Sequence, residues 1–511
     1  MLVKIYGSAV YGIGATTITI EVNIARGAKF ILVGLPDNAV KESKERIHVA
    51  MYNQGYRWPG YKVVVNMSPA DIRKEGSAYD LPIAMGVLVG SKQLIAPDIS
   101  SYVIMGEVSL DGTILPIKGA LPIAIQARKE GFKGLLLPAE NAKEAAIVDG
   151  LKVYGMKTLS EVCEFFKNSE DLKPEYVDTR AIFKIEQTNN SNDFSEVKGQ
   201  ENIKRALEIA AAGGHNVILI GPPGAGKTML AKRFPSILPP LTLGEALETT
   251  KIHSVAGKLK GNASLVALRP FRSPHHTISD VALVGGGSVP QPGEISLAHN
   301  GVLFLDELPE FKRTVLEVMR QPLEDRVVTI SRSKFSIEFP ASFTLVASMN
   351  PCPCGYYNHP EKQCVCGPGL VQKYLNRVSG PLLDRIDLHV EVTPVSFEEL
   401  TDTSKSESSE EIRKRVIIAR KEQESRFTET KIHCNAQMST SILKEHCEIN
   451  KEAMTLLKLA MEKLDLSARA YDRILKVSRT IADLDNSPNI ETVHIAEAIQ
   501  YRSLDREAWA G

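Results

Sequence analysis

The sequence predicts an α/β protein with a helical C-terminal region, because three patterns divide its 511 residues. Strand-like runs alternate with helix-like stretches up to about residue 166. A phosphate-binding glycine pattern then follows a buried-strand candidate, Val217–Ile220. Beyond residue 411, apolar residues recur at helical spacing instead. Since a domain typically takes about 150 residues, the length predicts two to four domains.

The first α/β domain is expected over residues 1–167. Its strand candidates are Lys29–Leu35, Lys62–Met67, Tyr102–Leu110 and Gly134–Pro138, and its helix candidates are Asn38–Gln54, Asp80–Leu88, Gly119–Glu130 and Ala139–Asp149. Residues 168–192 and 401–411 are polar, so both are expected to be linkers. They bound a central domain, 193–400, and a helical region, 412–511, with helix candidates Lys451–Leu464, Ala468–Leu484 and Thr492–Tyr501.

Composition and charge exclude several classes of protein. Apolar residues make up 43% and charged residues 24% of the chain, which is the balance of a globular protein. The longest apolar stretches fall short of the ~20 residues that cross a bilayer, and the N-terminus lacks a secretory pattern, so we expect a cytoplasmic protein without membrane contact. Lys plus Arg and Asp plus Glu number 61 each, so any DNA contact must be local.

A P-loop is the strongest motif in the chain. It consists of Gly221, Pro222, Pro223, Gly224, Ala225, Gly226, Lys227 and Thr228. The glycines allow backbone N–H groups to wrap phosphates at a helix N-terminus. Lys227 would neutralise the β and γ oxygens, and the Thr228 hydroxyl would bind Mg²⁺. The motif therefore predicts ATP and Mg²⁺ as cofactors.

Two further strand ends carry candidate catalytic residues. The apolar run Val302–Leu305 ends in Asp306 and Glu307, where Asp306 would hold Mg²⁺ and Glu307 would activate the attacking water. Asn350 follows the next strand candidate and would orient that water. An acidic pair is often a helix cap and an asparagine a turn residue. Their order after a P-loop favours the catalytic interpretation.

Three arginines are candidates for contacts with the γ-phosphate. Arg385 lies between Asp384 and Asp387 and would reach the nucleotide of a neighbouring subunit, which requires a ring. The alternative is a surface ion pair with either aspartate. Arg469 and Arg473 lie four residues apart on a helix candidate, and either could act from a lid; Arg469 is preferred.

Four of the seven cysteines form two Cys-x-Cys-Gly elements: Cys352, Cys354, Cys364 and Cys366. Four thiolates make a closed tetrahedral site, so a structural Zn²⁺ is expected, with reduced loop cysteines as the alternative. His359 lies between the pairs and could replace one ligand. The isolated Cys163, Cys434 and Cys447 are expected to be packing residues.

Several motifs together resemble the ComM/YifB family of magnesium-chelatase-like AAA+ ATPases. They are Phe194–Gln200, His215–Asn216, the P-loop, Gly301–Leu308, Ser348–Gly355 and Ser379–Asp387, and the resemblance covers essentially the whole chain. It implies an AAA+ core with a helical lid, assembled as a homo-hexamer. It also implies an ATP-driven DNA motor for branch migration of recombination intermediates, notably during natural transformation. A chelatase-like or chaperone-like remodeller of a protein partner is the alternative.

The resemblance also implies two insertions in the central domain. Pro270–Asn300 is too long for a simple connection and is a candidate helix-2 insert. Val327–Arg332 and Phe335–Phe339 are expected to form a β-hairpin before Asn350. Arg332 and Lys334 at its tip would contact a DNA backbone inside a pore, unless this is an ordinary surface hairpin.

The first domain resembles the Lon-protease-like fold that this family carries. Gly106–Gly112, Leu115–Ile117 and Leu137–Asn141 carry this resemblance. Such a protease needs a serine activated by a lysine amine. Ala78 and Leu121 occupy the corresponding positions, with Ser77 beside the first. The domain is therefore expected to be a catalytically inactive scaffold or DNA-contacting module.

Overall fold

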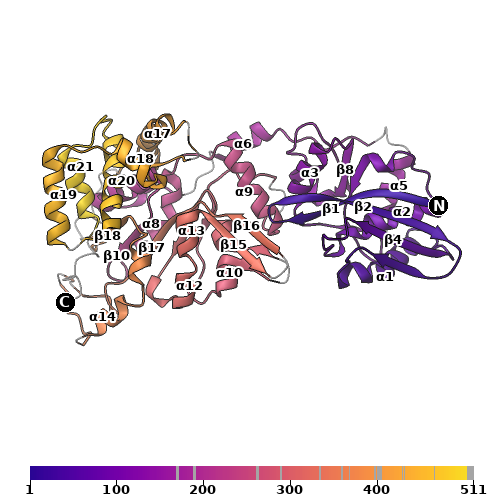
Figure 1. Cartoon of the computed structure of the whole chain (residues 1–511), viewed down its shortest axis with the longest axis horizontal. Coiled ribbons are helices and arrows are strands. Elements are labelled where there is room, and N and C mark those ends of the chain that lie inside the picture. Colours follow the sequence, from indigo (N-terminus) through magenta and orange to yellow (C-terminus); the bar gives the residue numbers. More distant parts are fainter. Residues whose placement is uncertain are drawn as a thin grey trace.

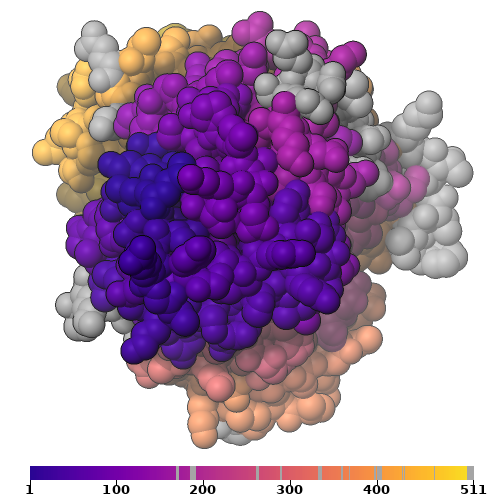
Figure 2. Space-filling view, turned by 90° about the vertical axis from the view of Figure 1, so that its right-hand side faces the viewer, coloured from indigo at the N-terminus to yellow at the C-terminus, as the bar shows by residue number. Residues whose placement is uncertain are grey.

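The computed structural model places an α/β unit at one end of the chain, helices at the other end and a parallel sheet between them (Figure 1). Seen from its N-terminal end, the molecule presents mainly this first unit (Figure 2). The structure describes residues 1–167, 172–187, 192–259, 264–287, 290–332, 335–357, 359, 361–367, 369–395, 399, 406–428, 430, 432–464 and 466–502. Within these residues, no helix is both long and apolar enough to span a bilayer.

The N-terminal unit is a mixed sheet in the order β3-β4-β2-β1-β5-β8-β9. Its elements are β1 (Leu2–Tyr11), β2 (Gly14–Ala25), β3 (Phe30–Val33), α1 (Asn38–Asn53), β4 (Lys62–Ser68), α2 (Asp80–Gly90), β5 (Tyr102–Ile104), β6 (Glu107–Val108), β7 (Ile114–Leu115), α3 (Ala120–Lys129), β8 (Gly134–Pro138), α4 (Ala139–Ala145), β9 (Lys152–Met156), α5 (Leu159–Lys167) and α6 (Thr179–Gln187). Every residue of α2 is buried, because the helix lies between the sheet and α1.

The two positions that align with a Lon-type dyad carry no nucleophile or base. Ala78 lies in the 3-10 turn Ser77–Tyr79, and the neighbouring Ser77 hydroxyl donates to the carboxylate of Glu107. Leu121 is fully buried in α3, and its backbone N–H donates to the Glu144 carboxylate at 2.9 Å. Neither position can therefore supply the hydroxyl or the amine that the dyad requires.

The central unit is a five-stranded sheet in the order β11-β14-β17-β10-β18, and all its pairs are parallel. Its elements are α7 (Glu201–Gly213), β10 (Val217–Ile220), α8 (Lys227–Arg233), α9 (Leu243–Val255), β11 (Phe271–Arg272), α10 (Asp280–Val284), β12 (Gly285–Gly286), β13 (Gln291–Pro292), α11 (Glu294–Leu297), β14 (Val302–Leu305), α12 (Arg313–Glu317), α13 (Arg320–Asp325), β15 (Val327–Arg332), β16 (Phe335–Pro340), β17 (Thr344–Met349), α14 (Leu370–Leu375), α15 (Gly380–Leu383) and β18 (Leu388–Glu391).

Both faces of this sheet are buried, as parallel strands require. Alternate residues of β10 point to opposite faces: Val217 and Leu219 join one apolar cluster, and Ile218 and Ile220 join another. The expected insert before β14 is built from short elements, α10 to α11, and the expected hairpin is β15 paired with β16. The sheet thereby aligns the carboxyl ends of β10, β14 and β17 at one edge.

The C-terminal helices share a core with this sheet. They are α17 (Ser409–Arg426), α18 (Thr440–His446), α19 (Lys451–Lys463), α20 (Ala468–Leu484) and α21 (Thr492–Gln500). Apolar residues of α19 to α21 belong to the same cluster as Val217 and Leu219. His215 Nε2 lies 2.8 Å from the Thr480 hydroxyl, and both groups are buried. The helices therefore pack directly on α7 and the sheet.

The N-terminal and central units touch at α9 and at the β15–β16 hairpin. Leu241, Ala246 and Leu265 belong to the apolar cluster of the N-terminal unit, and the buried Ser254 hydroxyl at the end of α9 donates to Glu144 in α4. The Tyr11 hydroxyl, at the end of β1, donates to a carbonyl of β16 at 3.5 Å. Residues 168–192, which were expected to be a linker, include the helix α6, and Ile182 and Phe183 of this helix pack on the N-terminal core.

Candidate nucleotide-binding site

The P-loop connects β10 to α8 at the carboxyl edge of the central sheet. Gly224 and Gly226 have φ angles of 81° and 84°, a left-handed conformation that glycine adopts without steric cost. The Lys227 ammonium donates to the carbonyls of Gly221 at 2.6 Å and Pro222 at 2.8 Å. Lys227 thus folds over the loop, and its side chain occupies the position from which it would reach phosphate oxygens.

Lys227 is a buried cation. Burial lowers the pKa of its ammonium, and the neighbouring Asp306 and Glu307 carboxylates oppose this shift. Only 9% of the residue is exposed. Because its contacts here are mostly to neutral carbonyls, an anionic ligand at the loop would stabilise the charged form further.

The two expected Mg²⁺ ligands lie side by side. The Thr228 hydroxyl donates to Asp306 Oδ2 at 2.8 Å, and the Ser348 hydroxyl donates to the other carboxylate oxygen. Hydroxyl and carboxylate oxygens are the donors that Mg²⁺ prefers in proteins. The arrangement therefore fits a Mg²⁺ site between α8 and β14.

Glu307 and Asn350 flank the same edge. Glu307 has a φ of 54°, an uncommon left-handed conformation for a residue with a side chain, and its carboxylate lies 3.6 Å from His276 Nδ1. Asn350 follows β17, and its amide oxygen accepts from Lys227 at 3.1 Å. The structure thus brings Lys227, Thr228, Asp306, Glu307 and Asn350 together.

The three arginines lie apart from this group in the isolated chain. Arg385 is 7% exposed, and its guanidinium contacts Glu324 and the Pro381 carbonyl. This pairing differs from both aspartate alternatives considered from the sequence. Arg469, 62% exposed at its side chain, lies 3.5 Å from Asp384. Arg473 donates to Asp387 at 2.8 Å.

Asp387 is a buried carboxylate that depends on Arg473. It is 1% exposed, and it also accepts from the Asn216 N–H at 3.0 Å. Burial raises the pKa of Asp387, but Arg473 and His215 outweigh burial and hold that pKa below its usual range. Because the folded-state pKa is depressed, the resulting stabilisation is present above the unfolded value of about 3.9 and is lost as the pH falls below it.

Replacing Arg473 with leucine is therefore expected to lower the free energy of unfolding by about 3 kcal/mol at pH 7, because Asp387 would stay buried without its cation. The deficit should shrink near pH 4, where Asp387 of the variant can bind a proton. Urea unfolding of wild type, Arg473→Leu and Arg473→Lys at both pH values measures this. Equal stability of wild type and Arg473→Leu at pH 7 would contradict it.

The expected DNA contacts fall at the limit of the described chain. Arg332 is the last residue of β15, with its side chain outside the described atoms, and Lys334 lies outside the described residues. The hairpin itself is paired from Val327↔Pro340 to Arg332↔Phe335. The contacts of Arg332 and Lys334 with DNA inside a pore remain predictions.

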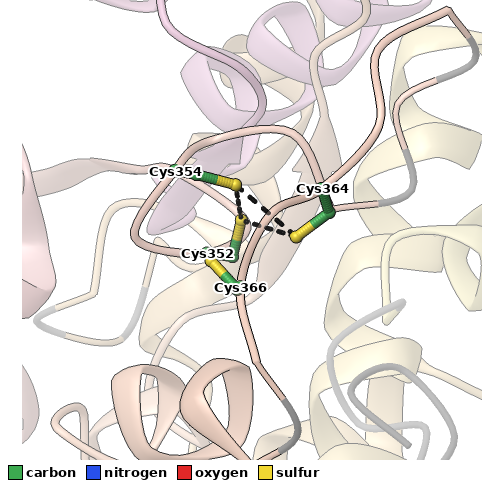
Figure 3. Close-up of side chains that lie close together, drawn as sticks. All are labelled: Cys352, Cys354, Cys364 and Cys366. Carbon is green, nitrogen blue, oxygen red and sulfur yellow. Dashed lines mark hydrogen bonds between the residues drawn. The ribbon is translucent and has the colours of Figure 1, made fainter.

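The four cysteines converge in a loop that follows Asn350 (Figure 3). The sulfurs of Cys352 and Cys354 lie 3.3 Å apart, and Cys364 lies 3.7 and 3.5 Å from these two. One sulfur from each of the four residues, Cys366 included, lies within 4.8 Å of the others. His359 is not in this group; its Nδ1 accepts from the N–H groups of Glu361 and Lys362.

The structure adds polar residues that sequence reasoning missed. The Ser348 hydroxyl donates to Asp306, and His276 lies beside Glu307. Ser348 belongs to a family motif and His276 to the expected insert, but neither was expected to contact these acidic residues. A groove with three cationic residues lies between the start of α12 and α14, and its cavity measures about 350 Å³. It is lined by Pro309, Glu310, Phe311, Arg313, Lys373, Asn376 and Arg377. The cationic residue Arg313 is far from Lys373 and Arg377 in the sequence. The groove therefore becomes visible only in the fold, where α14 lies near the segment after β14.

The parallel sheet, the P-loop and the acidic and asparagine strand ends define the class of protein: an AAA+ fold of the magnesium-chelatase type. Three family models match consecutive parts of the chain: "Subunit ChlI of Mg-chelatase" at residues 20–141, "Magnesium chelatase, subunit ChlI" at 193–400, and "Magnesium chelatase, subunit ChlI C-terminal" at 406–502.

The relatives identify the family within this class. The chain is 43% identical over 509 residues to competence protein ComM of Haemophilus influenzae, covering 99% of this chain and 98% of that protein. It is 43% identical over 511 residues to the uncharacterized protein YifB of Escherichia coli, covering 98% and 97%. Lon protease 2 of Bacillus subtilis is 33% identical over 159 residues, covering 28% and 27%. The chain belongs to the ComM/YifB family of magnesium-chelatase-like AAA+ proteins.

Proposed function

We propose that this protein hydrolyses ATP with Mg²⁺ at the carboxyl edge of its central sheet. One observation carries the proposal: the Lys227 ammonium, the paired Thr228 and Asp306 oxygens and the Asn350 amide converge beside a glycine loop. Lys227 binds the β and γ phosphates, and Thr228 with Asp306 holds Mg²⁺, which neutralises the phosphate charge when bound. Glu307 accepts a proton from the attacking water, which Asn350 orients.

Completion of this site takes a second subunit. Arg385 acts on the nucleotide of the next protomer in a ring of six, after it exchanges Glu324 for the γ-phosphate. Arg469 is exposed and acts from the helical region within the same chain, whereas Arg473 contributes mainly through Asp387. The division 1–167, 193–400 and 412–511 separates the N-terminal unit, the motor core and this helical lid.

The work done with ATP is movement along DNA, and branch migration of recombination intermediates is its most specific form. The relative named competence protein ComM supports this, and so does the basic tip that the sequence gives the β15–β16 hairpin. The magnesium-chelatase models support a second candidate, remodelling of a protein partner. The Zn²⁺ expected from the sequence would bind to cysteines that are separate from the Mg²⁺ ligands.

Branched DNA is expected to stimulate ATP hydrolysis and to be migrated by wild type in the presence of ATP. Phosphate release with and without a Holliday junction, and product strands on a native gel, measure the two effects. Arg332→Ala with Lys334→Ala should abolish the stimulation while basal hydrolysis persists, because only phosphate contacts are removed. Hydrolysis that responds to a protein partner and ignores every DNA would favour the remodeller.

A further inference from the structure

The cysteine cluster has the geometry of a single-ion site. Zn–S bonds of about 2.3 Å place the sulfurs of a tetrahedral site roughly 3.8 Å apart. The three closest sulfur pairs here are separated by 3.3, 3.5 and 3.7 Å. A disulfide needs about 2.05 Å, so these cysteines are not bonded to one another. A cluster of several irons would spread its cysteine sulfurs farther than one ion does.

The loop that carries the cysteines has little apolar core of its own. Cys352 is buried, but the other three cysteines are only partly buried, and Val365 between two of them is 84% exposed. Such a loop gains most of its order from a bound ion.

The same loop touches the nucleotide site. Cys352 lies two residues after Asn350, which accepts from Lys227. Gly355 has a φ of 86°, and a Cβ at this residue would lie 2.5 Å from Pro223 Cδ, so the loop backbone packs against the P-loop. A change in the loop is therefore transmitted directly to Asn350 and to the phosphate-binding backbone.

We infer that Cys352, Cys354, Cys364 and Cys366 bind one Zn²⁺, and that this ion holds the loop after β17 against the P-loop. The ion does no chemistry itself, because four thiolates leave no open position. It acts as a positioning element for Asn350 and Pro223, so zinc occupancy sets the affinity for ATP. The second half of this inference rests on the proposed nucleotide site, whereas the first half does not.

Purified wild type is expected to contain about one zinc ion per chain, measured by inductively coupled plasma mass spectrometry. Growth with Co²⁺ should give the visible absorption bands of a tetrahedral thiolate site. The double variant Cys354→Ala with Cys364→Ala should lose the metal, and its dissociation constant for a fluorescent ATP analogue should rise about tenfold. Cys163→Ala, which removes another buried cysteine, should retain both metal and affinity.

Extraction from wild type tests the same point if the double variant fails to fold. A mercurial reagent should release zinc and weaken binding of the ATP analogue. Dithiothreitol with added Zn²⁺ should reverse both effects. Chains that contain iron, or that take up no metal from a Zn²⁺ solution, would overturn the site. Chains whose analogue affinity is unchanged on zinc loss would overturn the positioning role. The zinc content is measured without ATP or DNA. The test of the zinc site therefore stays valid even if the proposed ATPase and DNA activities are wrong.

Discussion

Lys227→Ala is expected to weaken ATP binding by about a hundredfold and to make hydrolysis undetectable. In the structure, this ammonium is the only charged donor that the described P-loop residues offer, and it is already desolvated. Its loss removes charge-assisted hydrogen bonds to phosphate oxygens that water does not replace. Binding of a fluorescent ATP analogue and phosphate release under saturating Mg²⁺ measure the two effects.

Lys232→Ala is the matched control, because Lys232 lies on the same helix α8 and is exposed. It should bind and hydrolyse ATP as the wild type does. Lys227 also donates to two carbonyls of the loop, so the thermal midpoint of the variant must be compared with that of wild type. If a folded Lys227→Ala protein bound the ATP analogue as tightly as the wild type does, the assignment of the nucleotide site to this loop would be wrong.

Glu307→Gln is expected to retain ATP binding and to reduce the turnover number by a factor of about 100 or more. The amide keeps the size of the side chain but no longer accepts a proton from water. In the present structure the carboxylate lies 3.6 Å from His276 Nδ1, so catalysis requires Glu307 to leave this contact. Analogue binding, ring assembly by light scattering and steady-state phosphate release separate the effects.

Glu310→Gln serves as the control for loss of a nearby charge, since Glu310 is exposed and pairs with Arg377. Its turnover should stay within about twofold of wild type, because exposed ion pairs contribute little. If Glu307→Gln turned over ATP at the wild-type rate, the general base would have to be another group. Ser348 and His276 would then be the next residues to replace.

Local patterns predicted part of the central α/β unit. The P-loop is contiguous, and β14 is an apolar run that ends in recognisable residues, so its expected limits, Val302–Leu305, match the structure. The long strand β1 was missed because Gly7 and Ser8 interrupt its apolar pattern and its parallel partner β5 lies far along the chain. The strand β2 was also missed, although Ile18, Ile20 and Val22 alternate with polar residues as a half-buried strand requires. The helix α6 was missed because its short apolar stripe lies in a polar surrounding.

Contacts between distant residues could not be predicted from spacing. The pairing of Arg385 with Glu324 depends on how α13 packs beside α15, and the contact of His276 with Glu307 depends on the path of the insert. The contact between Gly355 and Pro223 likewise arises from folding of the loop after β17. The sequence identifies some of these residues as candidates, but it does not show which residues lie next to them in space.

The shared apolar patch at α9 bears on how the two α/β units can unfold. Leu241, Ala246 and Leu265 are covered by the N-terminal core, so a chain beginning at residue 193 would expose them to water. Burial of each of the two leucine side chains is worth roughly 1.5–3 kcal/mol. We therefore expect the N-terminal unit to stabilise the central unit, and the two units to unfold together in a melting experiment.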